Sequence, residues 1–393
     1  MPFDVDTPTN LFREIILPYA YKGTVATTTL HGLAEGKKAH RIIHSAGFND
    51  SGKEYRHFVK WGDEKTLTGA NFAGQVKDIQ PGPTVNFGDA GLGDGSLVAG
   101  VLTQAAEQPH LQDKPWLVNG REVVADLALQ AAVNLVDPLF AHKGTVIRIT
   151  NDVYARAFNN SAQPDAGHTF VLKGTTPEEV KAEVQALGPS LKQLWAEKTA
   201  VAFHREGDET AFDAVFANGA GAGVDYLTLS HAFKLQREPE FWAEKIIAPL
   251  AESLKPGGIL IGTHAAGGDA SEDVARLLLP ETNFFPNDAH TVLDAAKAEL
   301  TRKGHGAAAF SYKAHAPLEY SLKQVRPLES GAYGQDDLVN TWRALAYAGQ
   351  ISGYLPEHVT LNECLAATDT VLRRQNGQPR QRNNVYSIQR APA

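Results

Sequence analysis

The sequence predicts an α/β protein built around a mostly parallel sheet. In residues 81–152, and again in residues 223–327, short apolar strands alternate with segments of helical periodicity. A third observation is a cluster of glycines in residues 91–95, which follows an apolar run and precedes a helical one. Glycine loses much backbone entropy on folding, so such a cluster marks a tight turn or a place where a ligand lies against the main chain.

The composition is that of an ordinary globular protein. The chain has 393 residues, of which 43% are hydrophobic and 21% charged, which suits one large elaborated domain. The formal net charge of −8 and the pI of about 6.0 argue against a broad surface for nucleic acids or anionic membranes. The basic run at residues 373–382 is short and flanked by polar residues, so we interpret it as a solvated tail, with a binding arm as the alternative.

The sequence also bears on where the protein acts. Residues 1–20 lack the basic end and apolar core of a signal peptide, and no apolar run approaches the ~20 residues that span a bilayer. The single cysteine, Cys364, excludes an internal disulfide and a zinc cluster. We therefore expect a cytoplasmic protein with no metal, no membrane partner and no nucleic acid partner.

The glycine cluster lies between a predicted strand at residues 84–87 and a predicted helix at residues 96–108. A turn in this place presents backbone N–H groups of the helix N-terminus. The dinucleotide fingerprint G-x-G-x-x-G is matched poorly, because Ser96 occupies the place of its third glycine. The pattern that the sequence does show is Asp89-x-Gly91-x-Gly93-x-Gly95. A loop without a ligand is the alternative interpretation of this stretch alone.

This pattern resembles motif I of the class I S-adenosylmethionine-dependent methyltransferases. In that family the glycine turn packs against the methionine part of the cofactor, which carries no phosphate. The resemblance implies that Gly91, Gly93 and Gly95 form this turn, and that Asp89 helps to position the amino end of the cofactor. It also implies a Rossmann-like sheet, mostly parallel, with seven strands of which the last is antiparallel.

A second stretch, residues 223–265, is similar to the fourth strand, the following helix and the fifth strand of the same family. The family has an Asp-led strand, a helix ending in Leu-Lys-Pro-Gly-Gly and then an apolar strand, and residues 254–262 here read LKPGGILIG. We expect the helix to end at Lys255, because Pro256 cannot continue it and the glycines turn the chain. The two motifs in this order favour the methyltransferase interpretation more than either does alone.

The resemblance implies a ribose contact after the second strand. The family places an acidic residue there, which accepts hydrogen bonds from the ribose hydroxyls. Glu122 follows the apolar run at residues 116–118 and fits this place, whereas Asp126 falls where the next helix should already have begun. A helix-capping or surface acid is the alternative interpretation of Glu122.

Strand three has two candidates, residues 144–154 and residues 199–208. We favour the first, because the second would leave an unusually long connection before the Pro-Gly-Gly turn. Asn151 and Asp152 then lie where the family often binds the adenine amino group. This choice also implies an inserted α+β segment at about 153–222, which serves as a lid or as a dimer surface.

Three polar residues end the strands that follow. Ser230 and His231 end predicted strand four, and His264 ends strand five; these strands are neighbours in the methyltransferase topology. Ligands bind beyond the carboxyl ends of such strands, so Ser230 is a candidate cofactor contact and both histidines are candidate bases. Methyl transfer also proceeds by in-line positioning without a base, and a histidine bonded to the backbone is the alternative. A metal site that adds Asp269 is disfavoured, because no dense acidic cluster accompanies these residues.

The expected domain organisation has three parts. Residues 1–80 form an N-terminal helical or lid region, and residues 81–327 form the methyltransferase core. Residues 315–325 alternate like the strand that closes the sheet. Residues 328–393 form a C-terminal extension of helices followed by a polar tail.

Taken together, the motifs imply an enzyme that binds S-adenosylmethionine and transfers its methyl group to nitrogen or oxygen of a small molecule, with a homodimer as one assembly to consider. Two alternatives share the fold. One is transfer of the aminocarboxypropyl group of the same cofactor, and the other is a non-catalytic binding or scaffold subunit. A nicotinamide oxidoreductase fits less well because of Ser96.

Overall fold

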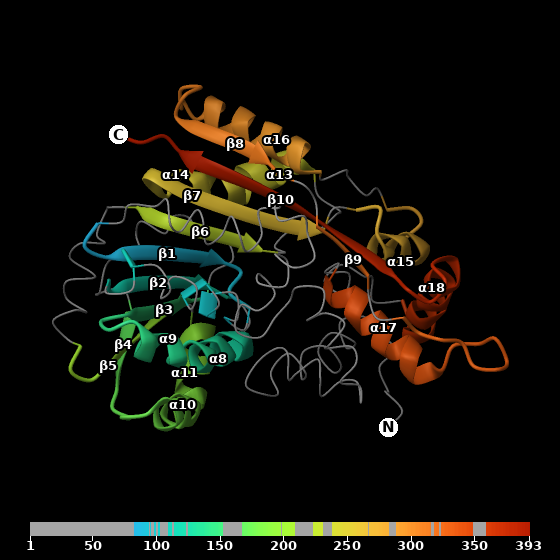
Figure 1. Cartoon of the computed structure of the whole chain (residues 1–393), viewed down its shortest axis with the longest axis horizontal. Helices are drawn as coiled ribbons and strands as arrows, with labels where there is room; N and C mark the ends of the chain where they lie inside the picture. Colours follow the sequence, from blue (N-terminus) through green and yellow to red (C-terminus); the bar gives the residue numbers. More distant parts are fainter. Residues whose placement is uncertain are drawn as a thin grey trace.

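The computed structural model shows a twisted mixed sheet with helices on both of its faces (Figure 1). It describes residues 82–393 with gaps, and the predicted N-terminal region at residues 1–80 lies outside the described residues. Within 82–393 the residues not described are 94, 96–97, 100, 103–108, 112–113, 123–124, 152–166, 198, 209–222, 231–237, 266, 283–287, 316–317, 322–323 and 349–358.

The described residues form ten strands of one sheet, in the order β4-β5-β3-β2-β1-β6-β7-β10-β8, with β9 paired to β10 outside this path. Their bounds are β1 Val85–Ala90, β2 Trp116–Arg121, β3 Val146–Thr150, β4 Gly167–Leu172, β5 Ala200–Arg205, β6 Val224–Ser230, β7 Leu254–Ala265, β8 Phe310–Ala314, β9 Leu318–Ser321 and β10 Arg380–Arg390. The prediction of seven strands is therefore too low, because β4, β5 and β9 extend the sheet.

The central strands confirm the predicted α/β class. β3, β2, β1, β6 and β7 pair in parallel, and β10 is antiparallel to both β7 and β8. The chain runs outward from β1 through β2 to β3, then returns to the other side of β1 with β6. The strand order thus reverses between β1 and β6, which is where open α/β sheets of this kind bind their ligands.

The choice of strand three is confirmed. β3 pairs in parallel with β2 at the predicted place, and the rejected candidate forms β5, which is antiparallel to β3. The described part of the insertion consists of β4, β5 and two helices, α10 (Pro177–Ala186) and α11 (Gly188–Ala196). Since β4 and β5 pair with each other and β5 pairs with β3, the insertion lengthens the central sheet.

The predicted polar tail is wrong. Residues 380–390 form β10, which lies inside the sheet between β7 and β8, and the basic run is divided between the end of α18 (Leu361–Arg374), a turn and the start of β10. The core therefore extends beyond residue 327. The predicted closing strand at residues 315–325 contributes the short β9, which pairs with Arg380–Asn383. Only Val385, Tyr386 and Ile388 give β10 apolar character, too few for the pattern to stand out.

Two apolar layers enclose the sheet. One face packs on α8 (Ala125–Asn134), α9 (Val136–Ala141), α10 and α11, through a core that includes Phe87, Trp116 and Ile149. The other packs on α13 (Pro239–Trp242), the π-helical turn η5 (Ala243–Ile247), α14 (Ala248–Glu252) and α16 (Ala289–Arg302). A separate group of helices, α15 (Ala270–Leu278), α17 (Gln335–Ala348) and α18, lies at the far end of β10 (Figure 1).

The helix before β7 ends earlier than the sequence predicts. α14 ends at Glu252, and Leu254 already belongs to β7, so Lys255 and Pro256 lie in the strand. Lys255 forms an ion pair with Asp225, whose second carboxylate oxygen accepts the backbone N–H of Asn86 at 2.8 Å. The Asp and Lys of the second motif thus tie β1, β6 and β7 together at the end of β6 opposite Ser230, which is a structural role.

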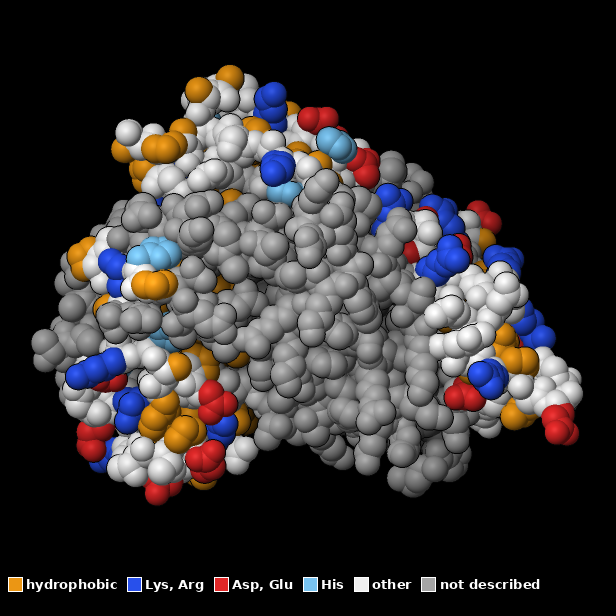
Figure 2. Space-filling model, viewed as in Figure 1, with side chains coloured by type: hydrophobic (Ala, Val, Ile, Leu, Met, Phe, Trp, Pro, Cys, Tyr) orange, Lys and Arg blue, Asp and Glu red, His pale blue; other side chains and the backbone are white. Residues whose placement is uncertain are grey.

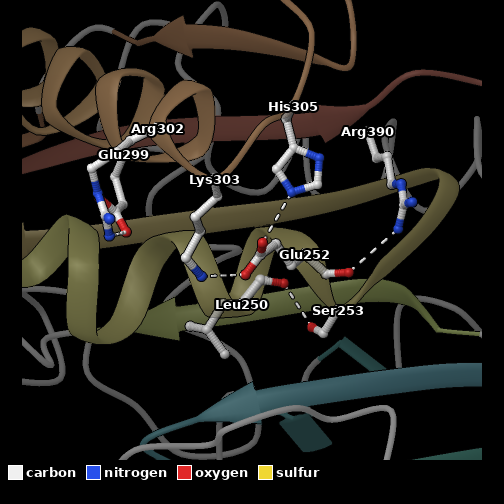
Figure 3. Close-up of polar contacts among 8 residues, drawn as sticks. All are labelled: Leu250, Glu252, Ser253, Glu299, Arg302, Lys303, His305 and Arg390. Atoms are coloured by element: carbon white, nitrogen blue, oxygen red, sulfur yellow. Dashed lines mark hydrogen bonds and ion pairs between the residues drawn. The ribbon is translucent and has the colours of Figure 1, made fainter.

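A second polar network lies near the Asp225–Lys255 pair, where the chain passes from α14 into β7 (Figure 3). The carboxylate of Glu252 pairs with Lys303 and lies 2.9 Å from Nε2 of His305, so the end of α14 is tied to the end of α16. Arg390, the last residue of β10, donates from Nη1 to the carbonyl oxygens of Glu252 at 3.3 Å and Leu254 at 2.6 Å. The network therefore anchors β10 to the turn between α14 and β7.

Candidate functional site

The candidate site lies at the carboxyl ends of β1, β2 and β6. β1 continues through Ala90, three residues beyond the predicted strand, so Asp89 lies inside the strand and not in the turn. Asp89 is opposite Gly120 of β2 on one side and Thr228 of β6 on the other. This places its side chain at the point where the strand order reverses.

Asp89 is a fully buried carboxyl group with one unused oxygen. Its Oδ1 accepts a hydrogen bond of 2.6 Å from the hydroxyl of Thr228, and its Oδ2 is buried with no hydrogen-bond partner among the described residues. Burial raises the pKa of Asp89 to about 7; the Thr228 hydrogen bond acts in the opposite direction, and the charge of Glu122 adds to the increase. A cation or a hydrogen-bond donor at Oδ2 would relieve this unfavourable burial.

The glycine turn uses its described amides within the chain. The N–H groups of Gly91 and Leu92 donate to the carbonyl oxygen of Arg121 at 3.1 and 2.8 Å. The N–H of Gly95 donates to the carbonyl oxygen of Leu92 at 2.9 Å, and that of Gly93 donates to Oε2 of Glu122 at 2.8 Å. The turn is therefore closed by its own hydrogen bonds and by a carboxylate.

The three glycines of the turn share a backbone conformation but differ in the space around their Cβ positions. All have positive φ, of 100° at Gly91, 55° at Gly93 and 77° at Gly95, a region that other residues rarely adopt. A Cβ at Gly95 would lie 3.0 Å from Cα and Cβ of Ala131 in α8, so this glycine also allows the turn to pack closely against α8. A Cβ at Gly93 would meet nothing within 4 Å, so this glycine borders open space.

Glu122 lies where the resemblance places it, directly after β2. Its N–H donates to the carbonyl oxygen of Thr150 at 3.1 Å, and its side chain is 7% exposed. The carboxylate reaches across to the turn through Gly93, so Glu122 and Asp89 flank the same backbone segment. The competitor Asp126 lies in the first turn of α8.

Asn151 directly follows β3 and has a structural contact. Its Nδ2 donates to the carbonyl oxygen of Trp195 at 2.8 Å, and the Trp195 indole N–H donates to Ile149 at 3.2 Å. Asn151 therefore connects β3 to α11. Asp152 and His231 lie outside the described residues, and Ser230 is the last residue of β6.

His264 is not brought together with Asp89. Leu260 and Tyr386 belong to the core on one face of the sheet, and Ile261 and Phe87 belong to the core on the other. Because side chains alternate along a strand, Asp89 lies on the face of Phe87. His264 shares the face of Leu260, is buried, and packs its ring against Tyr386 with centroids 5.6 Å apart. Its Nε2 lies 3.3 Å from Nδ2 of Asn384 in β10.

Asp269, the third member of the disfavoured metal site, caps a helix. It is the N-cap of α15, and its Oδ1 accepts the N–H of Glu272 at 2.9 Å. Across the part of the chain that the structure describes, no group of three or more His, Cys, Asp or Glu side chains is arranged to hold a metal ion. Within the same residues, no helix has the length and apolar character needed to cross a membrane.

Sequence reasoning missed two residues of this site. Thr228 gave no signal beyond its place two residues before the end of β6, yet its hydroxyl is the partner of Asp89. Gly120 is the other: a Cβ there would overlap the side chain of Leu92, which lies over β2 as the turn begins. The glycine after the apolar run of β2 was the available signal for this close approach.

Comparisons with known proteins give no family assignment. No protein-family model matches the sequence, and no curated protein does. Solved structures that overlay on the chain include phosphoethanolamine N-methyltransferase 2 from Haemonchus contortus, with 10% identity, 95% of this chain and 60% of that one covered, and a TM-score of 0.33. This chain therefore spans about 60% of the length of that enzyme.

Two further overlays are of similar quality. The YcgJ protein from Bacillus subtilis has 11% identity, coverage of 82% of this chain and 99% of that one, and a TM-score of 0.37. A putative sarcosine dimethylglycine methyltransferase from Galdieria sulphuraria has 9% identity, coverage of 86% of each chain and a TM-score of 0.35. Overlays this loose add nothing to the fold, which is established by the strand order and pairing of this chain itself.

Proposed function

We propose that the chain is an S-adenosylmethionine-dependent methyltransferase that acts on a small molecule. The observation that carries the proposal is the glycine turn, whose described amides are all hydrogen-bonded within the chain while Gly93 borders open space. A phosphate-binding turn directs free N–H groups at its ligand. This turn instead offers bare backbone flanked by two carboxyl groups, which suits a ligand that has hydroxyls and an ammonium group but no phosphate.

The residues present fit this cofactor. We assign Glu122 to the ribose hydroxyls, because its buried carboxylate lies beyond β2 and has acceptor capacity in addition to its bond from Gly93. We assign Asp89 to the amino end, because its buried Oδ2 lacks a partner among the described residues and an ammonium group would supply both a donor and a positive charge. The backbone at Gly93 would lie against the cofactor between them.

When bound, the cofactor supplies a methyl group on a sulfonium centre, and the protein has to hold an acceptor in line with it. His231, directly after β6, is our candidate to take a proton from the acceptor, and Ser230, Asn151 and Asp152 remain proposed cofactor contacts. For His264 we propose a positioning role, holding β7 against β10 through Asn384, because its side chain lies on the other face of the sheet.

We place the acceptor among small molecules. The net charge is −8, and on the face that Figure 2 shows, Lys and Arg side chains of the described residues are interspersed with Asp and Glu. Arginines gather around α15, α18 and the start of β10, but Arg276 and Arg373 there are paired with Glu272 and Asp369. Such a surface does not favour the phosphate backbone of a nucleic acid.

The test is isothermal titration calorimetry with S-adenosylhomocysteine on the wild type, Gly93→Asp and Gly207→Asp. Gly207 is the matched control, because it has a positive φ of 88° and open space around its Cβ position, but lies in the turn after β5. We expect the wild type and Gly207→Asp to bind alike. Gly93→Asp should bind about tenfold more weakly or worse, because its side chain fills the open space and adds a negative charge beside Glu122.

Absence of binding by the wild type, or equal binding by Gly93→Asp, would overturn the proposed site. Binding alone leaves the reaction open, so the second measurement follows the label from methyl-labelled S-adenosylmethionine into product during incubation with small-molecule acceptors. Label in the product supports methyl transfer. A product that carries the aminocarboxypropyl carbons instead would overturn it.

A further inference from the structure

The hydroxyl of Thr228 lies between two acceptors but has a single proton to donate. Its Oγ1 is 2.6 Å from Oδ1 of Asp89 and 3.3 Å from the carbonyl oxygen of Gly88. One O–H group cannot form both bonds well at the same time. Two arrangements of protons therefore fit the same heavy-atom positions, and they differ in whether Asp89 carries a proton.

These two arrangements are the two charge states of Asp89. In the charged state Thr228 donates to Oδ1, and the charged Oδ2 is buried with no donor among the described residues. In the neutral state the carboxyl proton on Oδ1 is donated to Oγ1 of Thr228, whose own proton turns to the carbonyl oxygen of Gly88. Oδ2 is then an uncharged carbonyl oxygen, and its burial costs much less than the burial of a charge.

The charged groups around Asp89 favour the neutral state in the protein without ligand. Arg121 is on the opposite face of the sheet, because it alternates in step with Leu117 of the separate apolar cluster there. Burial raises the pKa of Asp89 to about 7; the Thr228 hydrogen bond opposes the increase, and the negative charge of Glu122 adds to it.

Neither β6 nor the segment after β1 brings a cation to Asp89 among the described residues. On the face of Asp89, β6 carries Thr228 and Tyr226, whose ring stacks on that of Phe87 with centroids 5.5 Å apart. The described residues that follow β1 are glycines and apolar residues: Gly91, Leu92, Gly93, Gly95, Val98, Ala99, Val101 and Leu102. Within this set, a positive charge at Oδ2 comes only from a ligand.

We propose that Asp89 and Thr228 form a proton-linked selector for the amino end of the cofactor: the protein without ligand keeps a proton on Asp89, and the ammonium group of the ligand displaces it. This inference rests on the proposed function. The carboxyl proton passes to the solvent, Thr228 turns its own proton from Gly88 to Oδ1, and the ammonium group donates to Oδ2 while it keeps its hydrogens. Affinity then rises with pH as long as Asp89 is protonated in the free protein.

The test is isothermal titration calorimetry with S-adenosylhomocysteine in phosphate and in imidazole buffer, which have the same pH but different heats of ionisation. The difference between the two observed heats gives the number of protons released for each ligand bound. The proteins are the wild type, Asp89→Asn, Thr228→Val and the control Asp288→Asn. Asp288 is the control because it is a carboxyl group that caps α16 at the surface.

The wild type and Asp288→Asn should release about half a proton at pH 7.0 and about 0.9 at pH 6.0, and their Kd should rise about fivefold between these values. Asp89→Asn should release almost no protons and lose this pH dependence, because its amide does not titrate. Thr228→Val removes the bond that lowers the pKa of Asp89, so it should release close to one proton at pH 7.0.

A second ligand separates the amino end from the ribose. Methylthioadenosine keeps the nucleoside and the thioether but has no amino group. It should bind the wild type without proton release and with the same Kd at pH 6.0 and pH 7.0. Titration of Glu122, which we assign to the ribose, would instead affect both ligands alike.

Binding of S-adenosylhomocysteine by the wild type without proton release would overturn this inference and leave the proposed function standing. Proton release that is unchanged in Asp89→Asn and Thr228→Val would also overturn it, because the proton would then belong to another buried group such as Asp269. If Asp89→Asn binds too weakly to measure, Thr228→Val decides, because an increase toward one proton is expected and no increase contradicts the proposal. Absence of binding by the wild type would overturn the proposed function and this inference with it.

Discussion

The replacement of Asp89 by Asn tests how the buried carboxyl group shapes the stability of the protein. Burial raises the pKa of Asp89 to about 7 from its ordinary value of 3.8. The folded state therefore binds the proton more tightly than the unfolded state between these two values, and stability falls as pH rises through that window. Asn keeps an oxygen to accept the hydroxyl of Thr228 but has no charge, so Asp89→Asn lacks this pH dependence.

The magnitude follows from the two pKa values. Between pH 5 and pH 8 the carboxyl group passes from mostly protonated to mostly charged in the folded state, while it is charged throughout in the unfolded state. At 1.36 kcal/mol per pH unit, this lowers the free energy of unfolding by about 2.5 kcal/mol. Asp89→Asn should gain that amount relative to the wild type over the same interval.

The assay is urea unfolding followed by circular dichroism, on wild type and Asp89→Asn at pH 5 and pH 8. The quantity compared is the difference in the free energy of unfolding between wild type and variant, at pH 5 and at pH 8. Other titrating groups, such as the buried Asp269, cancel because both proteins contain them. Asp288→Asn is the control, since Asp288 caps α16 at the surface and its pKa is lowered rather than raised. A wild-type-to-variant difference that is the same at both pH values, or that changes in the opposite direction, would refute the reasoning. Under the proposed function, S-adenosylhomocysteine should reduce the effect, because its ammonium group would lower the pKa of Asp89.

Gly95→Ala should lower the free energy of unfolding by about 1 kcal/mol more than Gly93→Ala does, because both residues have positive φ but only Gly95 would place its Cβ at 3.0 Å from Ala131. Urea unfolding of the two variants measures this difference. Equal losses would contradict the packing argument. Glu252→Gln should lose about 0.5 kcal/mol at low salt and less in 1 M sodium chloride, because the side chains of Glu252, Lys303 and His305 are each about 30% exposed and their attraction is screened. Burial raises the pKa of Glu252, but the bonds from Lys303 and His305 outweigh burial, so the pKa is lowered overall. The contribution of these ion pairs to stability should therefore fade as pH falls through the acid range. A loss that does not depend on salt would count against the ion pairs.

The central sheet and the edge that carries the candidate site were predictable from the sequence because their signals are local. The strand, glycine turn and helix at residues 85–102 are consecutive in the sequence. The Leu-Lys-Pro-Gly-Gly segment is likewise a continuous stretch, and it marks the entry to β7. The choice of strand three was also predictable, because connection lengths restrict it. Glu122 lies after β2 as expected, since an acid at a strand end is visible in the sequence.

The remaining features depend on contacts between distant residues. Nothing near Thr228 indicates that its hydroxyl meets Asp89, which is 139 residues away in the chain. β10 has few apolar residues, and its place in the sheet is set by pairing with β7, β8 and β9, which are distant in sequence. For His264 the end of the strand was predictable, but which face its ring takes depends on the exact register of β7, which no local pattern indicates.

The position of β10 has a consequence for how this chain reaches its native state on the ribosome. Asn384 meets His264 across 120 residues of sequence, so β7 is synthesised long before the strand that covers its outer edge. During that interval the backbone N–H and C=O groups of β7 and β8 stand open to any extended peptide nearby. Nascent chains should therefore be most prone to mispairing just before residues 380–390 emerge, and agents that shield exposed strands should act during that interval.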